Sequence, residues 1–196
     1  MLNSPFFHLA QAAVLVFVTS AGCAAGVGHS DDGVAVTSEA LSKCAPAIPE
    51  ALKVPAGNKL AFSLDAEGVQ MYQCQATATG GFAWVFLAPE ADLFGKHARI
   101  AGSHYAGPTW EALDGSTVVA ARVAGVTVDA TAIPWLLLQS VSNTGSGKMT
   151  PVTFIQRVDT TEGLAPTTGC DAEHVGAQAD VDYTATYHFY KAKGAR

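Results

Sequence analysis

The sequence predicts an all-β fold, in which a single domain forms an antiparallel β-sandwich or barrel with long irregular loops. Two observations predict it. Short segments of alternating or β-branched residues recur along the chain between clusters of turn residues. No segment carries the 3.6-residue period of a long amphipathic helix. The length of 196 residues suits one domain, and 49% hydrophobic with 14% charged residues suits a chain that buries a sizeable core.

The first half of the domain contains three expected strands and an approach segment. Residues 44–57 carry three prolines, so we expect them to run along the domain surface without regular structure. Residues 59–65 and 69–76 alternate in polarity, and the Glu67-Gly68 pair between them suits a hairpin turn. Residues 82–87 are apolar on both faces, which indicates a central strand that the following residues, 88–95, break.

The second half continues the pattern and ends on its clearest strand. We expect a short strand at 99–105 and further strands at 116–128, 133–141 and 150–158, with loops between them. Residues 160–169 are expected to form a loop, and 171–175 to make one helical turn capped by Asp171. Residues 181–190 alternate strictly, which is typical of a half-buried strand.

The N-terminus is expected to direct the domain out of the cytoplasm. Residues 1–22 have the apolar run of a signal peptide, and residues 23–42 are small, polar and acidic, as a flexible tether should be. Gly22-Cys23 resembles the lipobox of bacterial lipoproteins, which implies a lipid anchor on Cys23 and sorting to the outer membrane. The alternative is ordinary cleavage near Ala25 and secretion. Under either alternative, residues 43–196 form a single β-rich extracytoplasmic domain.

The chain has four cysteines: Cys23, Cys44, Cys74 and Cys170. If Cys23 is acylated, the other three allow one disulfide and one free thiol, and an oxidising compartment favours the bond. We prefer Cys74 with Cys170, because that bond ties an early strand to a late loop. Cys44 with Cys170 is the main rival. None of the spacings resembles a thiolate zinc site.

Residues 104–116 (HYAGPTWEALDGS) supply the candidate ligand-binding side chains. These are His104, Tyr105, Trp110, Glu111 and Asp114. Aromatic faces beside hydrogen-bonding acids are how proteins hold sugar rings, so a glycan is the candidate ligand. The competing explanation is structural: Gly107-Pro108 and Asp114-Gly115 form turns, and Trp110 plugs the end of the core.

Several other functions lack a sequence signal. No basic stripe supports nucleic-acid binding. The histidines form no metal-binding pattern and no cofactor motif is present, so we expect neither a metal nor a cofactor. No nucleophile motif such as GxSxG occurs. Arg157 is expected to pair with Asp171 or Glu173 and hold the late loop in place.

Seven segments resemble an uncharacterised family of secreted bacterial and fungal proteins, domain of unknown function three-four-five-five. They are GVQMYQC (68–74), FLAPEADLF (86–94), HYAGPTWEALDGS (104–116), IPWLLL (133–138), IQRV (155–158), GCDAEH (169–174) and YTATYHFY (183–190). The resemblance covers nearly all of the chain from about Pro49 onward. It implies an extracellular location and one compact domain, and it brings no established activity.

Together these observations favour a binding or structural module of the cell envelope over an enzyme. A glycan or another envelope component is the expected partner. The alternative is a hydrolase acting on cell-surface polymer, with Glu111, Asp114 and His104 as its acid–base set. An enzyme of that kind should gather the three side chains in one cleft.

Overall fold

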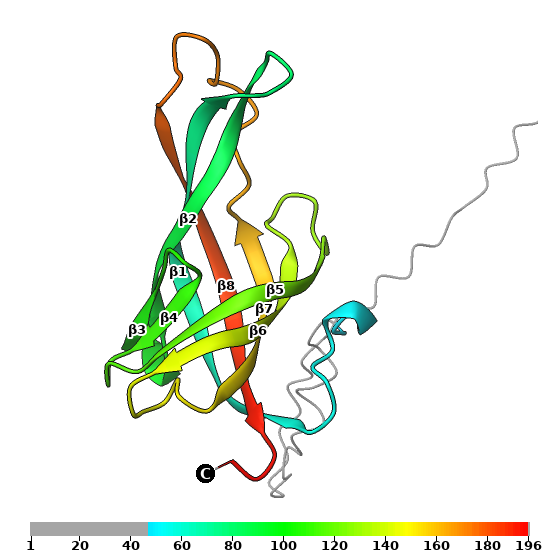
Figure 1. The fold of residues 1–196 in the computed structure, drawn as a ribbon, viewed down its shortest axis with the longest axis vertical. Helices are drawn as coiled ribbons and strands as arrows, with labels where there is room; N and C mark the ends of the chain where they lie inside the picture. The colour runs from blue at the N-terminus through cyan, green and yellow to red at the C-terminus, as the bar shows by residue number, and fades with distance from the viewer. Residues whose placement is uncertain (1–46, 196) are drawn as a thin grey trace, which may run out of the picture. The chain divides into compact units, whose positions relative to one another are not determined.

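A computed structural model describes residues 47–195, in which eight antiparallel strands form one closed barrel (Figure 1). Each strand pairs with the next along the chain, and β8 returns to pair with β1. The strands are β1 (Asn58–Ala76), β2 (Phe82–Phe94), β3 (Ile100–Tyr105), β4 (Thr109–Ala112), β5 (Thr117–Val126), β6 (Trp135–Thr144), β7 (Val152–Glu162) and β8 (Gln178–Ala192). Short 3-10 helices, η1 (Glu50–Leu52) and η2 (Lys96–Ala98), precede β1 and β3. The all-β prediction is confirmed, and the fold is a barrel.

The expected hairpin turn at Glu67-Gly68 is wrong, because β1 runs straight through both residues. Glycine is needed at position 68 for another reason. A Cβ there would overlap the carbonyl oxygen of Glu90 and the backbone of Ala91 on β2. Gly68 therefore lets β1 and β2 approach each other closely, which a turn-based interpretation of the sequence misses.

The expected end of a strand near Ala88 is also wrong, because β2 continues to Phe94. Its first half is not a central strand either: Phe86 is 48% exposed and Leu87 43% exposed. Strand β3 pairs with β2 only from Ala91 onward. Residues 82–90 therefore pair with β1 alone, and they extend past the rest of the barrel wall together with β1 and the first residues of β8 (Figure 1).

Two later boundaries differ from the sequence prediction as well. The stretch at 104–116 contains a complete short strand, β4, between two tight turns. Strand β7 continues to Glu162, where a loop was expected, because Thr161 and Glu162 still pair with Thr184 and Tyr183 of β8. Asp171 caps a turn by accepting hydrogen bonds from the backbone N–H groups of Glu173 and His174 at 2.9 and 3.2 Å.

The barrel interior and one outer face form two apolar clusters. The alternation predicted for 181–190 is confirmed, since Tyr183, Ala185, Tyr187 and Phe189 all point inward and are buried. Outside, Leu52 of η1 packs on Trp135, Leu137 and Val158. The buried Gln156 side chain donates to the Leu52 carbonyl oxygen at 2.6 Å, which fixes η1 against β7.

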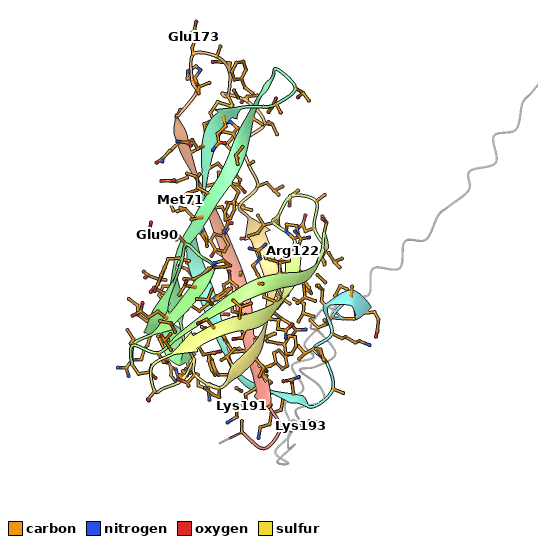
Figure 2. The ribbon with its side chains drawn as sticks, in the orientation of Figure 1. Met71, Glu90, Arg122, Glu173, Lys191 and Lys193 are labelled. Atoms are coloured by element: carbon orange, nitrogen blue, oxygen red, sulfur yellow. A yellow bond between two sulfur atoms is a disulfide. The ribbon has the colours of Figure 1, made fainter. Side chains whose placement is uncertain are left out.

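Cys74 and Cys170 form a disulfide, which confirms the preferred pairing and excludes the rival bond from Cys44 to Cys170. The bond ties the end of β1 to the loop between β7 and β8. In Figure 2, Glu173 marks the tip of that loop, and Lys191 and Lys193 mark the opposite end of the barrel. The signal peptide (1–22), the tether (23–42), the anchor at Cys23 and the first residues of the predicted domain lie outside the described residues. Between 47 and 195, no helix is long and apolar enough to cross a membrane.

Candidate functional site

One end of the barrel interior contains a cavity of about 190 Å³ to which all eight strands contribute. Its floor consists of buried residues, among them Gln70 of β1, His104 of β3 and Tyr187 of β8. Its rim consists of exposed residues from β2, the β3–β4 turn and β5: Phe86, Leu87, Gly107, Pro108 and Arg122. The far end of the interior is filled by apolar side chains that include Met149, Phe62 and Phe189. The cavity is thus a recess that reaches into the barrel from the end where Gly107-Pro108 turns.

A cluster of rings forms the cavity floor. His104 stacks on Trp110 with ring centroids 4.1 Å apart, and Tyr187 meets both rings edge-on at 5.3 and 5.4 Å. The His104 Nδ1 group donates to the Thr109 carbonyl oxygen at 2.8 Å, because a carbonyl can only accept. Burial lowers the pKa of His104 to about 3, so its imidazole is neutral at neutral pH. His104 therefore serves as an uncharged part of the floor.

Arg157 brings a positive charge to this interior. It occupies the position on β7 two residues after the buried Ile155, and so points to the same side of the sheet. Its Nε and Nη2 atoms both donate to the Pro134 carbonyl oxygen, at 3.2 and 2.9 Å. Burial raises the pKa of Tyr187, and the positive charge of Arg157 opposes that rise. The expected pairing of Arg157 with Asp171 or Glu173 is wrong, since residues 47–195 form ion pairs only at Lys53–Glu50 and His174–Asp171.

Arg122 supplies a second positive charge at the rim. It lies on β5 (Figure 2). By the alternation of the strand, it is on the same side as Val118 and Ala120, which are buried in the interior. A Cβ at Gly125 would collide with the Arg122 guanidinium and with Leu136. The glycine therefore allows the arginine to fold back over the strand toward Leu136, along the edge of the cavity.

The five side chains singled out from 104–116 do not gather in one place. His104 and Trp110 lie inside the barrel, at 3% and 1% exposure. Tyr105 and Glu111 lie outside, where the Tyr105 hydroxyl donates to Glu111 Oε2 at 2.8 Å and this bond raises the pKa of Tyr105.

Asp114 lies in the β4–β5 turn, at the opposite end of β4 from the Gly107-Pro108 turn. It accepts hydrogen bonds from the Ser116 backbone at 2.9 Å, the Ser116 hydroxyl at 2.5 Å and the Lys148 backbone at 2.8 Å. These bonds lower the pKa of Asp114, the Ser116 hydroxyl contributing most. Asp114 therefore joins the β4–β5 turn to the β6–β7 loop.

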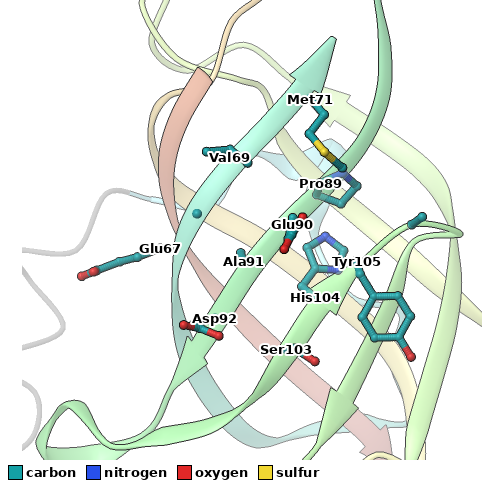
Figure 3. A pocket seen from close by; sticks show the side chains of 12 residues that line it. Glu67, Val69, Met71, Pro89, Glu90, Ala91, Asp92, Ser103, His104 and Tyr105 are labelled. Carbon is teal, nitrogen blue, oxygen red and sulfur yellow. The ribbon is translucent and has the colours of Figure 1, made fainter. Parts of the chain in front are cut away.

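Figure 3 shows a second depression, on the outer surface of the barrel wall. Acidic side chains of β1 and β2 surround it, namely Glu67, Glu90 and Asp92, and Tyr105 lies at its edge. This acidic outer groove has a volume of about 610 Å³ and is open to solvent. No group of three His, Cys, Asp or Glu side chains between residues 47 and 195 is arranged to hold a metal ion.

Gln70, Arg122 and Arg157 line the recess but were not among the residues predicted for a site. Their place in the cavity follows from strand register, which brings Leu136 of β6 opposite Arg157 and closes β8 onto β1. A signal was present in the sequence, however. Arg157 falls on the inward parity of β7 with Ile155, and Arg122 on that of β5 with Val118 and Ala120. A charged residue in phase with buried ones is a candidate for a functional interior.

The fold and this cavity define a class: a closed up-and-down barrel of eight strands with a cationic, aromatic-floored recess at one end. The chain belongs to the family described as protein of unknown function (DUF3455), whose model matches residues 55–191. That range includes all eight strands except the last residue of β8, and it includes every residue that lines the recess. No curated protein and no solved structure matches the chain.

Proposed function

We propose that this domain is an extracytoplasmic binding protein whose ligand occupies the recess at the barrel end. The observation that carries the proposal is the pair of buried N–H donors without an acceptor, Gln70 Nε2 and Trp110 Nε1, which both belong to residues lining the recess. A buried donor without a partner costs about 1–3 kcal/mol. A protein whose interior served only for stability would gain from apolar residues at these positions, so the polar lining indicates that the recess has another purpose.

The cellular setting of the proposal comes from the sequence and is consistent with the disulfide. Disulfides persist in oxidising compartments, so the Cys74–Cys170 bond is compatible with a location outside the cytoplasm. Anchoring through Cys23 would hold the binding domain at the outer membrane on its tether, and ordinary cleavage near Ala25 would release it. In both cases the ligand would come from the envelope or its surroundings.

A glycan is the second candidate ligand, at a different place. Tyr105 is 36% exposed, carries a hydrogen bond to Glu111 and borders the acidic outer groove, so it offers one aromatic face beside polar groups. Trp110 offers no such face, because it lies inside the barrel. The hydrolase alternative has less support, since Glu111, Asp114 and His104 lie outside the wall, in a distant turn and inside the barrel, respectively.

A thermal-shift screen on two variants separates these alternatives. Sugars, neutral aromatic molecules and small acids are added to the wild type, to Ala88→Phe, which fills the recess, and to Tyr105→Ala, which removes the outer ring. A ligand of the recess raises the melting temperature of the wild type and of Tyr105→Ala but not of Ala88→Phe, because only binding to the native state stabilises it. A sugar that requires Tyr105 instead moves the site to the outer groove. If no compound shifts the wild type, the binding proposal fails.

A further inference from the structure

The donors and acceptors around the recess are strongly unbalanced. Gln70 Nε2 and Trp110 Nε1 are buried donors without a partner. The indole N–H can only donate, and guanidinium groups also only donate. The residues that line the recess include two arginines and no carboxylate. The chemistry of the wall therefore calls for a ligand rich in acceptors.

The positive charge of the residues that line the recess indicates which kind of acceptor group the ligand carries. Arg157 donates from Nε and Nη2 to the Pro134 carbonyl oxygen, an acceptor that carries no net charge. Arg122 is exposed at the rim, and neither arginine has a carboxylate partner within ion-pair distance among residues 47–195. Two uncompensated guanidinium groups at the edge of a low-dielectric space attract an anion, and a planar carboxylate matches the guanidinium fork.

The apolar residues that line the recess, and the volume of the recess, determine the nature of the uncharged part of the ligand. Apolar side chains from β2 and β6 complete the lining, namely Ala88, Pro89, Leu136 and Leu138. A cavity of roughly 150 Å³ lined by apolar groups holds one benzene molecule. The recess, at about 190 Å³, therefore has room for a single ring or a short aliphatic chain.

We propose that the recess binds a small organic carboxylate, with its ring or short chain among the apolar walls and its carboxylate facing Arg157 and Arg122. This inference rests on the proposed binding function and adds the chemical class of the ligand. In this arrangement, the carboxylate oxygens accept from the arginines, and Gln70 and Trp110 contribute to the floor beneath the ring or chain.

Isothermal titration calorimetry with matched probes on the full chain, its disulfide formed, tests the inference. Benzoate is compared with benzamide, its neutral isostere, and with benzylamine, its cationic counterpart; hexanoate and hexanamide form a second pair. We expect each carboxylate to bind at least ten times more tightly than its amide, and benzylamine not to bind. High salt should weaken the binding of the carboxylates but not that of the amides.

Charge-removing variants assign the preference to residues. Arg157→Met and Arg122→Met should each weaken benzoate binding about tenfold and leave benzamide binding within twofold. Arg99→Met, at an exposed position between η2 and β3 that does not line the recess, is the matched control and should bind benzoate like the wild type. Arg157 also holds Pro134, so folding is checked by circular dichroism. If Arg157→Met does not fold, Arg122→Met and the acid-to-amide ratio of the wild type decide.

The possible failures are distinguishable. Equal affinity for benzoate and benzamide, with both lost in Ala88→Phe, would overturn the carboxylate inference and leave the proposed binding function standing. Benzoate binding that survives Ala88→Phe would place the anion outside the recess and overturn the inference as well. No binding of any probe, in a screen that also finds no thermal shift, would overturn both proposals.

Discussion

Lowering the pH should destabilise this protein through His104, a buried residue that is neutral in the folded state. The folded-state pKa is lowered from 6.5 to about 3, chiefly by burial, although the bond to the Thr109 carbonyl opposes the shift. Arg157 lowers the pKa further. The unfolded chain therefore binds a proton at His104 below pH 6.5 that the folded chain does not bind until about pH 3. By linkage, the free energy of unfolding falls as the pH drops through this window.

The magnitude follows from the width of the window. Each pH unit over which only the unfolded chain is protonated costs about 1.36 kcal/mol. Between the usual pKa of 6.5 and pH 5 the His104 contribution is thus about 2 kcal/mol. This value requires only that the folded-state pKa lie well below 5. Its limit, near pH 3, is about 5 kcal/mol.

Urea denaturation at about pH 7.5 and pH 5 measures this loss, with two variants that cannot titrate at position 104. His104→Asn keeps a side-chain N–H that can donate to Thr109, and His104→Phe keeps the stacking on Trp110. Each should be less stable than the wild type at pH 7.5 and should lose about 2 kcal/mol less on acidification. His97→Asn removes an exposed imidazole at a backbone φ of 62°, which asparagine adopts readily, and gives the reference slope.

One outcome would contradict this role of His104. If the wild type and both His104 variants lose the same free energy between the two pH values, His104 takes up its proton as easily in the folded protein as in the unfolded one. Water would then reach the floor of the recess, and the floor would accommodate a charged imidazole in place of the neutral one. His188, whose pKa burial also lowers, remains in all the variants and does not affect the difference between them.

Three further predictions concern the frame around the recess. Replacing both Cys74 and Cys170 by alanine should lower the free energy of unfolding, measured by urea denaturation, by about 4–5 kcal/mol, which is the chain-entropy value for a bond spanning 96 residues. A loss below about 1 kcal/mol would mean that the bond does not constrain the unfolded chain. Gly68→Ala should cost about 1–3 kcal/mol by overpacking against β2, whereas Gly81→Ala, where a Cβ meets only ordinary contacts, should cost less. Asp114→Asn should lower the melting temperature at neutral pH and reduce the loss of stability in acid. A carboxylate with a lowered pKa stabilises the fold above its usual pKa, and this stabilisation is lost as the pH falls through the folded-state pKa. Equal acid sensitivity of the variant and the wild type would contradict this role of Asp114.

The fold class was predictable because period-two alternation is a direct record of which side chains face inward. The strand at 181–190 is the clearest case: every second residue from Tyr183 to Phe189 is buried. The boundaries were less predictable, since Glu67-Gly68 has the composition of a turn. Only the position of Ala91 on the neighbouring strand explains the glycine there.

The site was half predictable. His104 and Trp110 were selected for their chemistry, and both line the recess, but the sequence did not show that they face inward while Tyr105 and Glu111 face outward. Four residues of β4 were too few to reveal an alternation. Arg157 and Gln70 meet there only after β7, β8 and β1 have paired, and pairing between segments so far apart in the chain is not visible in local composition.

Closure of the barrel by β1 and β8 has a consequence for how the chain folds. Seven of the strand pairs join neighbours in sequence, but the last one brings Asn58 against Ala192 and must wait for the whole chain. Such distant contacts make folding slow, and until they form, both strands expose unpaired edges that other chains can capture. The Cys74–Cys170 bond lies next to the Gln73–Gln178 pair, where this seam ends. In a chain that is oxidised early, the disulfide would keep the edges of β1 and β8 close together before they pair. Oxidation before closure should therefore speed folding and suppress aggregation.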